Sequence, residues 1–259
     1  MSEVTYTTEE GNKTMTEACM TKEHTKLTGL HEMVNQMLHL QNDMNRKVNS
    51  EWVAAQYPYY RAAWIECGEL VDHIGWKWWK QQELDLEQAQ LEMVDIWHFG
   101  LSMYVMDHDG DVETATEEVT TLVNVAVATD LTRHTEPKLP DVIEVIETLA
   151  AKLLTGKRFS VYHFIQICNM LDLDLEELHR QYVGKNILNF FRQDNGYKDG
   201  TYIKRWGKQE DNGVLTEILD NAKDIDVADV PEFIRTCLTN AYAAVLDAEK
   251  MLVKTTTES

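Results

Sequence analysis

Apolar residues recur along most of the chain at the three- and four-residue intervals of an amphipathic helix. The first such run starts at Leu27 and continues through Leu30, Met33, Val34 and Met37. The same spacing predicts further helices over residues 59–80, 86–106, 112–130, 140–154, 160–170, 174–192, 214–222 and 230–253. No segment alternates polar and apolar residues convincingly, as a half-buried strand does. The pattern therefore predicts an all-α fold, a helical bundle.

The helical pattern divides the chain into three parts. Residues 1–26 carry Thr, Glu and Lys without periodicity, and residues 254–259 are polar, so we expect a flexible segment at each end. Residues 27–253 are expected to form a single helical domain that carries the chemistry. Within this domain, the polar, glycine-containing segment 193–213 indicates a loop.

Composition excludes several classes of function. The formal net charge of −20 argues against a nonspecific nucleic-acid binder, which needs clustered Lys and Arg, so a phosphate that binds here needs a metal ion beside it. No apolar run approaches the roughly 20 residues that span a bilayer. The four cysteines form no CxxC pair, which favours a reducing compartment. We expect a cytoplasmic protein with no nucleic-acid or membrane partner.

Two acidic pairs lie inside the apolar faces of neighbouring helices. Glu66 and Glu69 are three residues apart on one predicted helix, and Glu92 and Asp95 have the same spacing on the next. Each pair shares its face with apolar side chains, so solvation does not explain the carboxylates. The short linker predicts that the two helices pack antiparallel, with the four acids facing one another.

Four carboxylates that face one another repel unless cations compensate them or some are protonated. Their oxygens suit a hard cation such as Mg²⁺ better than they suit zinc. Two alternatives stay open on the residues alone. The acids could form structural salt bridges with Lys77, Lys80 or other cations. The spacing Asp95-x-x-His98 is also found in di-iron carboxylate bundles, although the sequence contains only one such pair.

Five blocks between about residues 36 and 206 resemble one known family in the same order. Two of them contain or follow the first acidic pair, RAAWIECGELVDH at 61–73 and GWKWWK at 75–80, and EMVDIWHF at 92–99 contains the second. The others are LQNDMN at 40–45 and GKNILNFFRQDNGYKDGTYIK at 184–204. Together these blocks resemble the dimeric, all-α dUTPase family, which is related to the MazG-like pyrophosphatases and to phage dCTPase/dUTPase enzymes. The resemblance implies an all-α NTP pyrophosphatase fold.

The resemblance also implies roles for particular residues. Glu66, Glu69, Glu92 and Asp95 match the family's metal ligands, and we expect them to bind two or three Mg²⁺ ions. The positions that match substrate-binding residues are Gln41 and Asn45 at the uracil edge, Trp76 and His98 along the nucleoside, Lys77 beside them, and Lys185, Asn189, Arg192, Tyr197 and Lys204 toward the phosphates, the sugar or a third metal ion.

The activity that the resemblance implies is hydrolysis of dUTP, with dUDP as a second substrate, to dUMP by a metal-activated water. Glu69 is the expected general base and Glu66 the alternative, since either can ligate metal and still face the water. The resemblance implies a homodimer, and we expect Trp78 and Trp79 in the core or in its interface. Two other functions stay open: a pyrophosphatase for dCTP or a modified pyrimidine dNTP, and a helical nucleotide-sensing or interaction protein without turnover.

Overall fold

The computed structural model describes residues 9–130, 138–226 and 228–257 of the chain. Its elements, in chain order, are α1 (Glu9–Val48), α2 (Tyr59–Ile74), α3 (Leu86–Asp107), α4 (Val112–Thr129), α5 (Leu139–Gly156), α6 (Val161–Met170), α7 (Leu175–Asp194), β1 (Arg205–Trp206), β2 (Gln209–Glu210), α8 (Asp211–Asp220) and α9 (Val230–Thr257). Every predicted helix has a counterpart, and the all-α prediction is confirmed.

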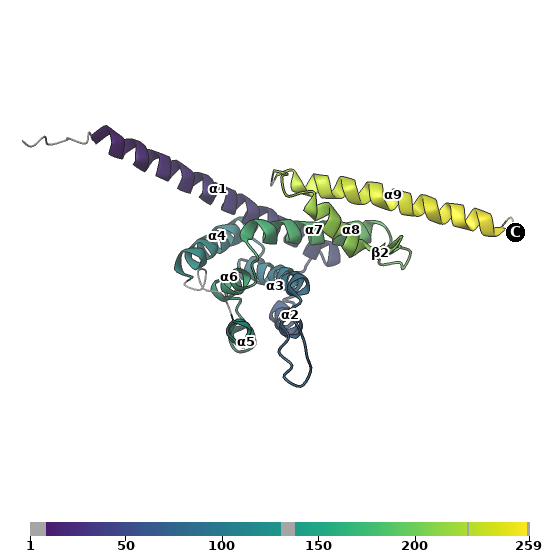
Figure 1. Cartoon of the computed structure of the whole chain (residues 1–259), viewed down its shortest axis with the longest axis horizontal. Helices are drawn as coiled ribbons and strands as arrows, with labels where there is room; N and C mark the ends of the chain where they lie inside the picture. The colour runs from purple at the N-terminus through teal and green to yellow at the C-terminus, as the bar shows by residue number, and fades with distance from the viewer. Residues whose placement is uncertain (1–8, 131–137, 227, 258–259) are drawn as a thin grey trace, which may run out of the picture.

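Helix α3 is the centre of the bundle. It contacts α1, α2, α4, α6 and α7, and Figure 1 shows it between α7 above and α2 below. Met93, Ile96, Trp97 and Leu101 are all buried, which is why this helix is apolar around most of its circumference. An acid placed on α3 is therefore close to side chains from several other helices.

Residue types at the helix ends explain where several helices begin. Asp85, Asp111 and Asp174 precede α3, α4 and α7, and the carboxylate of each accepts a hydrogen bond from the backbone N–H three residues further on. Such a bond satisfies one of the N–H groups that have no partner within the first turn of a helix. These caps fix the direction in which each helix leaves its loop.

Helix α2 ends earlier than the apolar spacing predicts. The predicted end at residue 80 is wrong, because Gly75 adopts a left-handed φ of 83° directly after Ile74 and stops the helix. Trp76, Trp78 and Trp79 consequently lie in the loop before α3, where their rings contact one another edge to face. Trp78 is 88 % exposed, so neither it nor Trp79 belongs to the core of this chain. A role in a dimer interface stays a prediction.

Helix α1 begins earlier than predicted. It starts at Glu9 rather than at Leu27, because Glu, Lys, Met and Ala favour helical backbone even where no apolar face is needed. Of the predicted flexible ends, residues 1–8 and 258–259 lie outside the described residues. The remaining parts of these two segments, residues 9–26 and 254–257, are described and are helical.

The predicted loop 193–213 contains a short hairpin. Trp206 of β1 pairs with Gln209 of β2, and Gly207 supplies the positive φ of 66° that the turn needs. The ring of Trp206 packs on Tyr242 of α9 at a centroid distance of 5.2 Å. The backbone N–H of Ile203 also donates to the Tyr242 hydroxyl at 3.1 Å. The segment is therefore attached to α9.

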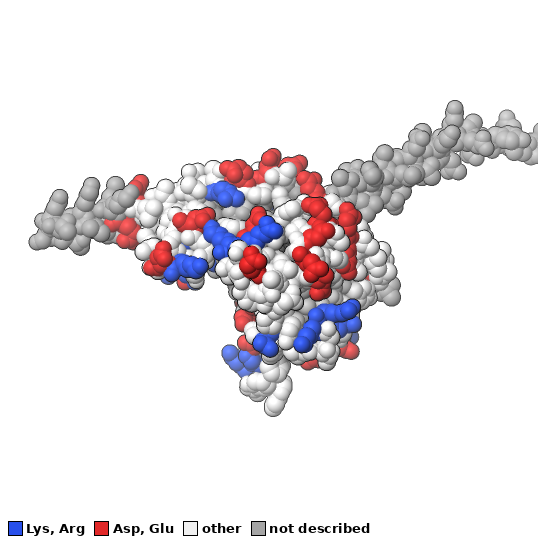
Figure 2. Space-filling view, turned by 180° about the vertical axis from the view of Figure 1, so that it is seen from behind, with Lys and Arg blue, Asp and Glu red and all other residues white. Residues whose placement is uncertain are grey.

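Acidic side chains are prominent on the surface. On the face seen in Figure 2, Asp and Glu are spread over the described surface, with Lys and Arg in smaller groups among them. Within the described ranges, no helix has the length and apolar character needed to cross a membrane.

Candidate functional site

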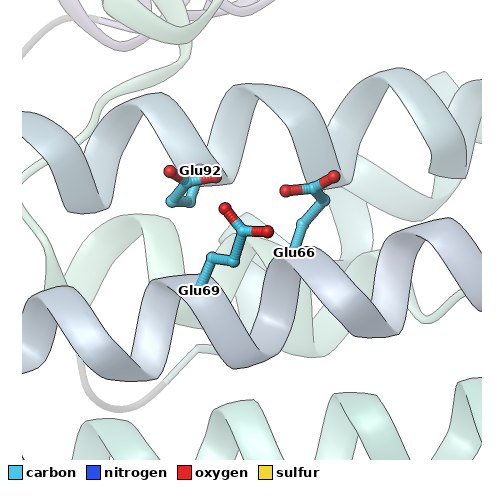
Figure 3. A group of neighbouring side chains, drawn as sticks. All are labelled: Glu66, Glu69 and Glu92. Carbon is cyan, nitrogen blue, oxygen red and sulfur yellow. The ribbon is translucent and has the colours of Figure 1, made fainter.

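Three of the four predicted acids gather between α2 and α3. Each of Glu66, Glu69 and Glu92 offers one carboxylate oxygen, and these oxygens all lie within 4.8 Å of one another. Figure 3 shows Glu66 and Glu69 rising from α2 toward Glu92 on α3. The three-residue spacing on α2 places two carboxylates one turn apart on the same side, and the antiparallel packing of α3 brings the third opposite them. We call Glu66, Glu69 and Glu92 the acidic triad.

The protonation of the triad shows how strongly the carboxylates affect one another. Burial, followed by the charges of Asp95, Glu69 and Glu92, raises the pKa of Glu66 from 4.5 to about 7. Burial and the charge of Asp95 also raise the pKa of Glu92, although Lys185 opposes this. Without a cation, the fold therefore favours a proton on Glu66 near neutral pH. A divalent cation would remove this repulsion, and three carboxylate oxygens are ligands that Mg²⁺ prefers.

Asp95, the fourth predicted ligand, lies close to the triad but forms an ion pair. Its carboxylate accepts a hydrogen bond from the Nζ of Lys185 on α7. The charge of Asp95 nevertheless contributes to the raised pKa values of Glu66 and Glu92. Asp95 is not one of the residues whose ligand oxygens converge within 4.8 Å, so its part in a metal site would require Lys185 to move to another anion, such as the phosphates of a substrate.

The salt-bridge alternative applies to part of the acidic group: Asp95 pairs with Lys185, and the Nε2 of His73 lies 3.6 Å from the carboxylate of Glu92. Lys77, in the loop after α2, pairs with Asp72, which is not one of the four acids. His98 is absent from the group of described residues whose ligand atoms converge, which contains carboxylates alone. Its ring Nδ1 instead meets the carbonyl of Val94 at 2.8 Å. The converging donors of the triad are therefore carboxylate oxygens, which suit a hard cation better than a di-iron centre, while Asp95 is held in a salt bridge.

One face of α3 connects the triad to a second group of polar residues. Glu92, Asp95, His98 and Ser102 follow one another at three- and four-residue intervals, so they share this face. Ser102 lies about 10 Å along the helix axis from Asp95, at about 1.5 Å per residue. A nucleoside spans a comparable length. Phosphates at the acids and a base beside Ser102 would therefore fit along a single helix.

The second polar group is buried between α1, α3 and α7. Gln41 and Asn45 are only 5 and 7 % exposed, and both donate hydrogen bonds to the Ser102 hydroxyl at 3.0 Å. Gln41 also donates to Asn45 at 3.1 Å and accepts from the Tyr182 hydroxyl at 2.7 Å. The amides that the sequence predicts at the uracil edge are therefore held in fixed positions by one another and by two further side chains.

His98 joins this group through its ring. The imidazole stacks on Tyr182 at a centroid distance of 4.0 Å, and burial lowers its pKa to about 4, so the ring is neutral near pH 7. Since Nδ1 meets a carbonyl oxygen, Nδ1 carries the proton and Nε2 is the acceptor. Nε2 is buried and has no hydrogen-bond partner among the described residues. We call Gln41, Asn45, His98, Ser102 and Tyr182 the amide network.

Comparison with known proteins gives the same family as the sequence blocks. A family model described as dUTPase matches residues 33–197, which include the acidic triad and the amide network. The chain belongs to the all-α dimeric dUTPase family. No curated protein matches it.

As a member of this family, the protein is a hydrolase, and family members are generally dependent on Mg²⁺. The oxygen-only donors of the acidic triad fit that ion. The prediction of an all-α dUTPase-type fold is confirmed by the family match and by the helical architecture.

The structure gives three of the other predicted substrate-binding cations partners within the chain. Lys185 forms the ion pair with Asp95 described above. Arg192 is held by two hydrogen bonds to buried Asp211, at 2.8 and 2.9 Å, and also contacts Asn189 at 3.1 Å. Lys204 pairs with Glu210 of the hairpin at 2.9 Å. Their roles toward a substrate stay predictions.

Two of the remaining predicted residues are exposed aromatics. Tyr197 lies in the loop after α7, with its ring near Tyr202 at a centroid distance of 6.1 Å. Trp76 directly follows the end of α2, one residue beyond Gly75. Both lie in segments without helical hydrogen bonds, so they can adjust to a ligand more easily than residues of the bundle.

Sequence reasoning missed three residues of the site and its supports: Ser102, Tyr182 and Asp211. The spacing of Ser102 from Glu92 and Asp95 on one helix face was a usable signal. No such signal exists for Tyr182 or Asp211. Tyr182 is distant in sequence from its partner Gln41, and an irregular segment separates Asp211 from its partner Arg192.

Magnesium is expected to raise the melting temperature more at pH 8 than at pH 5.5. The pKa of Glu66 is about 7 in the folded protein against 4.5 ordinarily, so the metal-free fold is stabilised by the proton and loses that stability as pH rises between these values. At low pH, Mg²⁺ must displace this proton, whereas at high pH it relieves repulsion. Thermal melts with EDTA and with Mg²⁺ at both pH values measure the difference.

The Glu66→Gln variant is the control for the metal-free melts. Its melting temperature should change less between the two pH values, because the titrating group is gone. Equal magnesium shifts at both pH values would contradict the proposed link between the metal and the Glu66 proton.

Proposed function

We propose that this protein hydrolyses dUTP to dUMP and pyrophosphate, with dUDP as a second substrate. The observation that carries the proposal is the acidic triad, whose three ligand oxygens lie within 4.8 Å of one another. The amide network supports it, because it offers hydrogen-bonding groups about one nucleoside length along α3 from the acids. Family membership supports the choice of a deoxyuridine nucleotide.

In the proposed reaction, the role of the acids would be to hold Mg²⁺, which would supply positive charge for the polyphosphate and activate a water. Glu66, Glu69, Glu92 and Asp95 would be the ligands for two or three Mg²⁺ ions, which supply charge for the phosphate oxygens and lower the pKa of a bound water. Glu69 is exposed at the open side of the triad, so its carboxylate can face solvent and accept the proton of the attacking water. We assign Glu69 as the general base.

Lys185 has a proposed role in binding the phosphates. In the structure its ammonium group is paired with Asp95. If Asp95 served as a metal ligand, Lys185 would be free to donate charge-assisted hydrogen bonds to a phosphate oxygen. Asn189, Arg192, Tyr197 and Lys204 would complete this side of the site from the end of α7 and from the segment that follows it.

The base is proposed to contact the amide network, with Gln41 and Asn45 at its polar edge. His98 offers an unpaired acceptor within the same network, and Trp76 and Lys77 would cover the nucleoside from the loop after α2. We also propose that the protein is a homodimer, with the exposed Trp78 as a candidate interface residue.

A substrate panel tests the proposal. Pyrophosphate release is measured with dUTP, dCTP, dTTP, dATP and dGTP, with Mg²⁺ and with EDTA, and dUDP is assayed for phosphate release. We expect magnesium-dependent release that is fastest with dUTP. Preferential release from dCTP would assign the alternative base, and no release from any nucleotide would favour a nucleotide-sensing protein and overturn the proposal.

Alanine at Gln41 or Asn45 is expected to reduce the preference for dUTP over dCTP by about tenfold, since each amide can form a direct hydrogen bond to the base. Asn42 is the matched control. It is a similarly buried amide on α1, but it accepts a hydrogen bond from the indole N–H of Trp52 at 3.2 Å. Asn42→Ala should lower the melting temperature and keep the base preference. An unchanged preference in the Gln41 and Asn45 variants would show that α1 does not recognise the base.

A further inference from the structure

Ser102 occupies the middle of the amide network. It is fully buried on α3, and its hydroxyl makes three hydrogen bonds: it donates to the carbonyl of His98 at 2.9 Å and accepts from Gln41 and Asn45 at 3.0 Å each. A serine hydroxyl has one proton and two lone pairs. All three are therefore used, and none is left for a ligand.

The hydrogen bonds of the Ser102 hydroxyl restrict the orientation of the two amides. Because the Ser102 proton is directed to a backbone carbonyl, only an N–H group can approach its lone pairs, so Gln41 and Asn45 must turn their nitrogens toward Ser102. The Tyr182 hydroxyl donates to the Gln41 oxygen at 2.7 Å, which fixes the same orientation from the other side. An amide that turned over would bring an oxygen against the Ser102 lone pairs, which is repulsive.

We propose that Ser102 is a positioning residue that fixes the orientation of the Gln41 and Asn45 amides and thereby makes the site select uracil over cytosine. This inference rests on the proposed function, in which these amides contact the base. Within the network, Asn45 keeps one N–H and one oxygen lone pair, so it presents a donor and an acceptor in fixed order.

Uracil and cytosine differ in this order along their polar edge. Uracil has an acceptor at O4 beside a donor at N3–H, whereas cytosine has a donor at its amino group beside an acceptor at N3. An asparagine whose amide can rotate by 180° can match the donor and acceptor of either base. An asparagine whose amide orientation is fixed matches only one of the two bases. The unpaired acceptor at His98 Nε2 is a second buried group in the network that suits a donor on the ligand.

The test compares Ser102→Ala with Thr116→Val, using the full-length protein and Mg²⁺. Thr116 is also buried within a helix, and its hydroxyl donates to the carbonyl four residues earlier at 2.8 Å, as that of Ser102 does. No amide side chain is among the contacts that the structure gives for Thr116. The readouts are kcat and KM for dUTP and dCTP separately, and the melting temperature.

For Ser102→Ala we expect the ratio of kcat/KM for dUTP to that for dCTP to fall by about tenfold, because the amides can then adopt either orientation. The loss should appear mainly as a higher KM for dUTP and a lower KM for dCTP. Ser102→Thr, which keeps the hydroxyl, should restore the ratio. Thr116→Val should change the melting temperature and keep the ratio of the wild type.

Tyr182→Phe is a second variant in case Ser102→Ala does not fold. It removes the hydroxyl that donates to Gln41 and keeps the ring that stacks on His98, so it should also lower the ratio. A wild-type ratio in both Ser102→Ala and Tyr182→Phe, with the wild type still selecting dUTP, would overturn the role of Ser102 and leave the proposed function standing. Failure of the wild type to hydrolyse dUTP would instead overturn the proposed function.

Discussion

The Glu69→Gln variant is expected to lose about a thousandfold or more of its dUTP turnover, the range typical of removing a general base. Glutamine keeps the size of the side chain but cannot accept the proton of the attacking water, and it is a weaker ligand for Mg²⁺. The helical circular dichroism and the melting temperature should stay close to those of the wild type, because Glu69 is exposed and makes no ion pair that the structure shows. Pyrophosphate release under saturating dUTP measures the effect.

Two controls separate the general base from a metal ligand. Glu87→Gln removes an exposed carboxylate in the first turn of α3, outside the triad, and should keep its activity. Calorimetric titration with Mg²⁺ shows whether Glu69→Gln still binds metal. The turnover of Glu66→Gln is measured beside that of Glu69→Gln. A larger loss of turnover in Glu66→Gln, combined with near-normal turnover in Glu69→Gln, would assign the general base to Glu66.

The Asp211→Ala variant is expected to lose about 3–5 kcal/mol of unfolding free energy, the usual cost of removing one partner from a buried ion pair. The Asp211 side chain is fully buried and accepts hydrogen bonds from Arg192 at 2.8 and 2.9 Å and from the Tyr202 hydroxyl at 2.7 Å. Although burial alone would raise it, these bonds hold the pKa of Asp211 below its ordinary value. Its removal leaves the phenol of Tyr202 without its acceptor, and it leaves the guanidinium of Arg192 without a negative charge beside it, bound only by the amide oxygens of Asn189 and Asn212.

Urea unfolding of Asp211→Ala measures this loss, with Asp220→Ala as the control. Asp220, the last residue of α8, forms an exposed ion pair with Lys223 in the turn that follows, and such pairs contribute little to stability. A double variant that replaces Arg192 and Asp211 by apolar residues should be more stable than Asp211→Ala, since no charge is then left unpaired. An Asp211→Ala protein as stable as the wild type would show that water reaches Arg192.

Arg192 is bound to Asp211 in the structure, whereas the resemblance of its sequence block implies that it contacts the substrate or a third metal ion. Asp211 and Asn212 bind its guanidinium group in the structure, and Tyr202 connects the pair to Tyr242 of α9 by stacking at 5.3 Å. Arg192 thereby attaches the segment after α7 to the bundle. Its role toward phosphates is a prediction that requires it to keep this pair or to exchange it for a substrate.

The candidate site shows how far local spacing can predict a site. Glu66 and Glu69, and Glu92 with Asp95, could be paired from their three-residue spacing, because neighbours on a helix face are fixed by local geometry. The ion pair between Asp95 and Lys185 could not be predicted in this way. Lys185 is distant in sequence and reaches Asp95 only through the packing of α7 on α3. Spacing predicted which residues are neighbours along a helix, and packing decided which of them meet across helices.

Helix ends follow the same division. Asp85, Asp111 and Asp174 cap their helices through backbone N–H groups only three residues away, so the starts of these helices depend on local interactions. Gly75 ends α2 by a local conformational preference that the apolar spacing did not take into account, since Trp76, Trp78 and Trp79 continued the pattern beyond it. Apolar spacing alone cannot distinguish a tryptophan that faces the core from one in an exposed loop. The prediction for Trp78 and Trp79 allowed the core or an interface; the structure places neither in the core of this chain, and the interface stays a prediction.

By itself, the sequence determined the all-α fold, the positions of the helices and the three- and four-residue spacings that place acids on one face, since all of these depend on residues close together in the chain. Only the tertiary structure decided that Ser102 and Tyr182 hold the amides of Gln41 and Asn45, that Asp211 neutralises Arg192, and that Glu66 carries a raised pKa. These features depend on the distance between side chains from different helices and on their removal from water, which the order of residues does not contain.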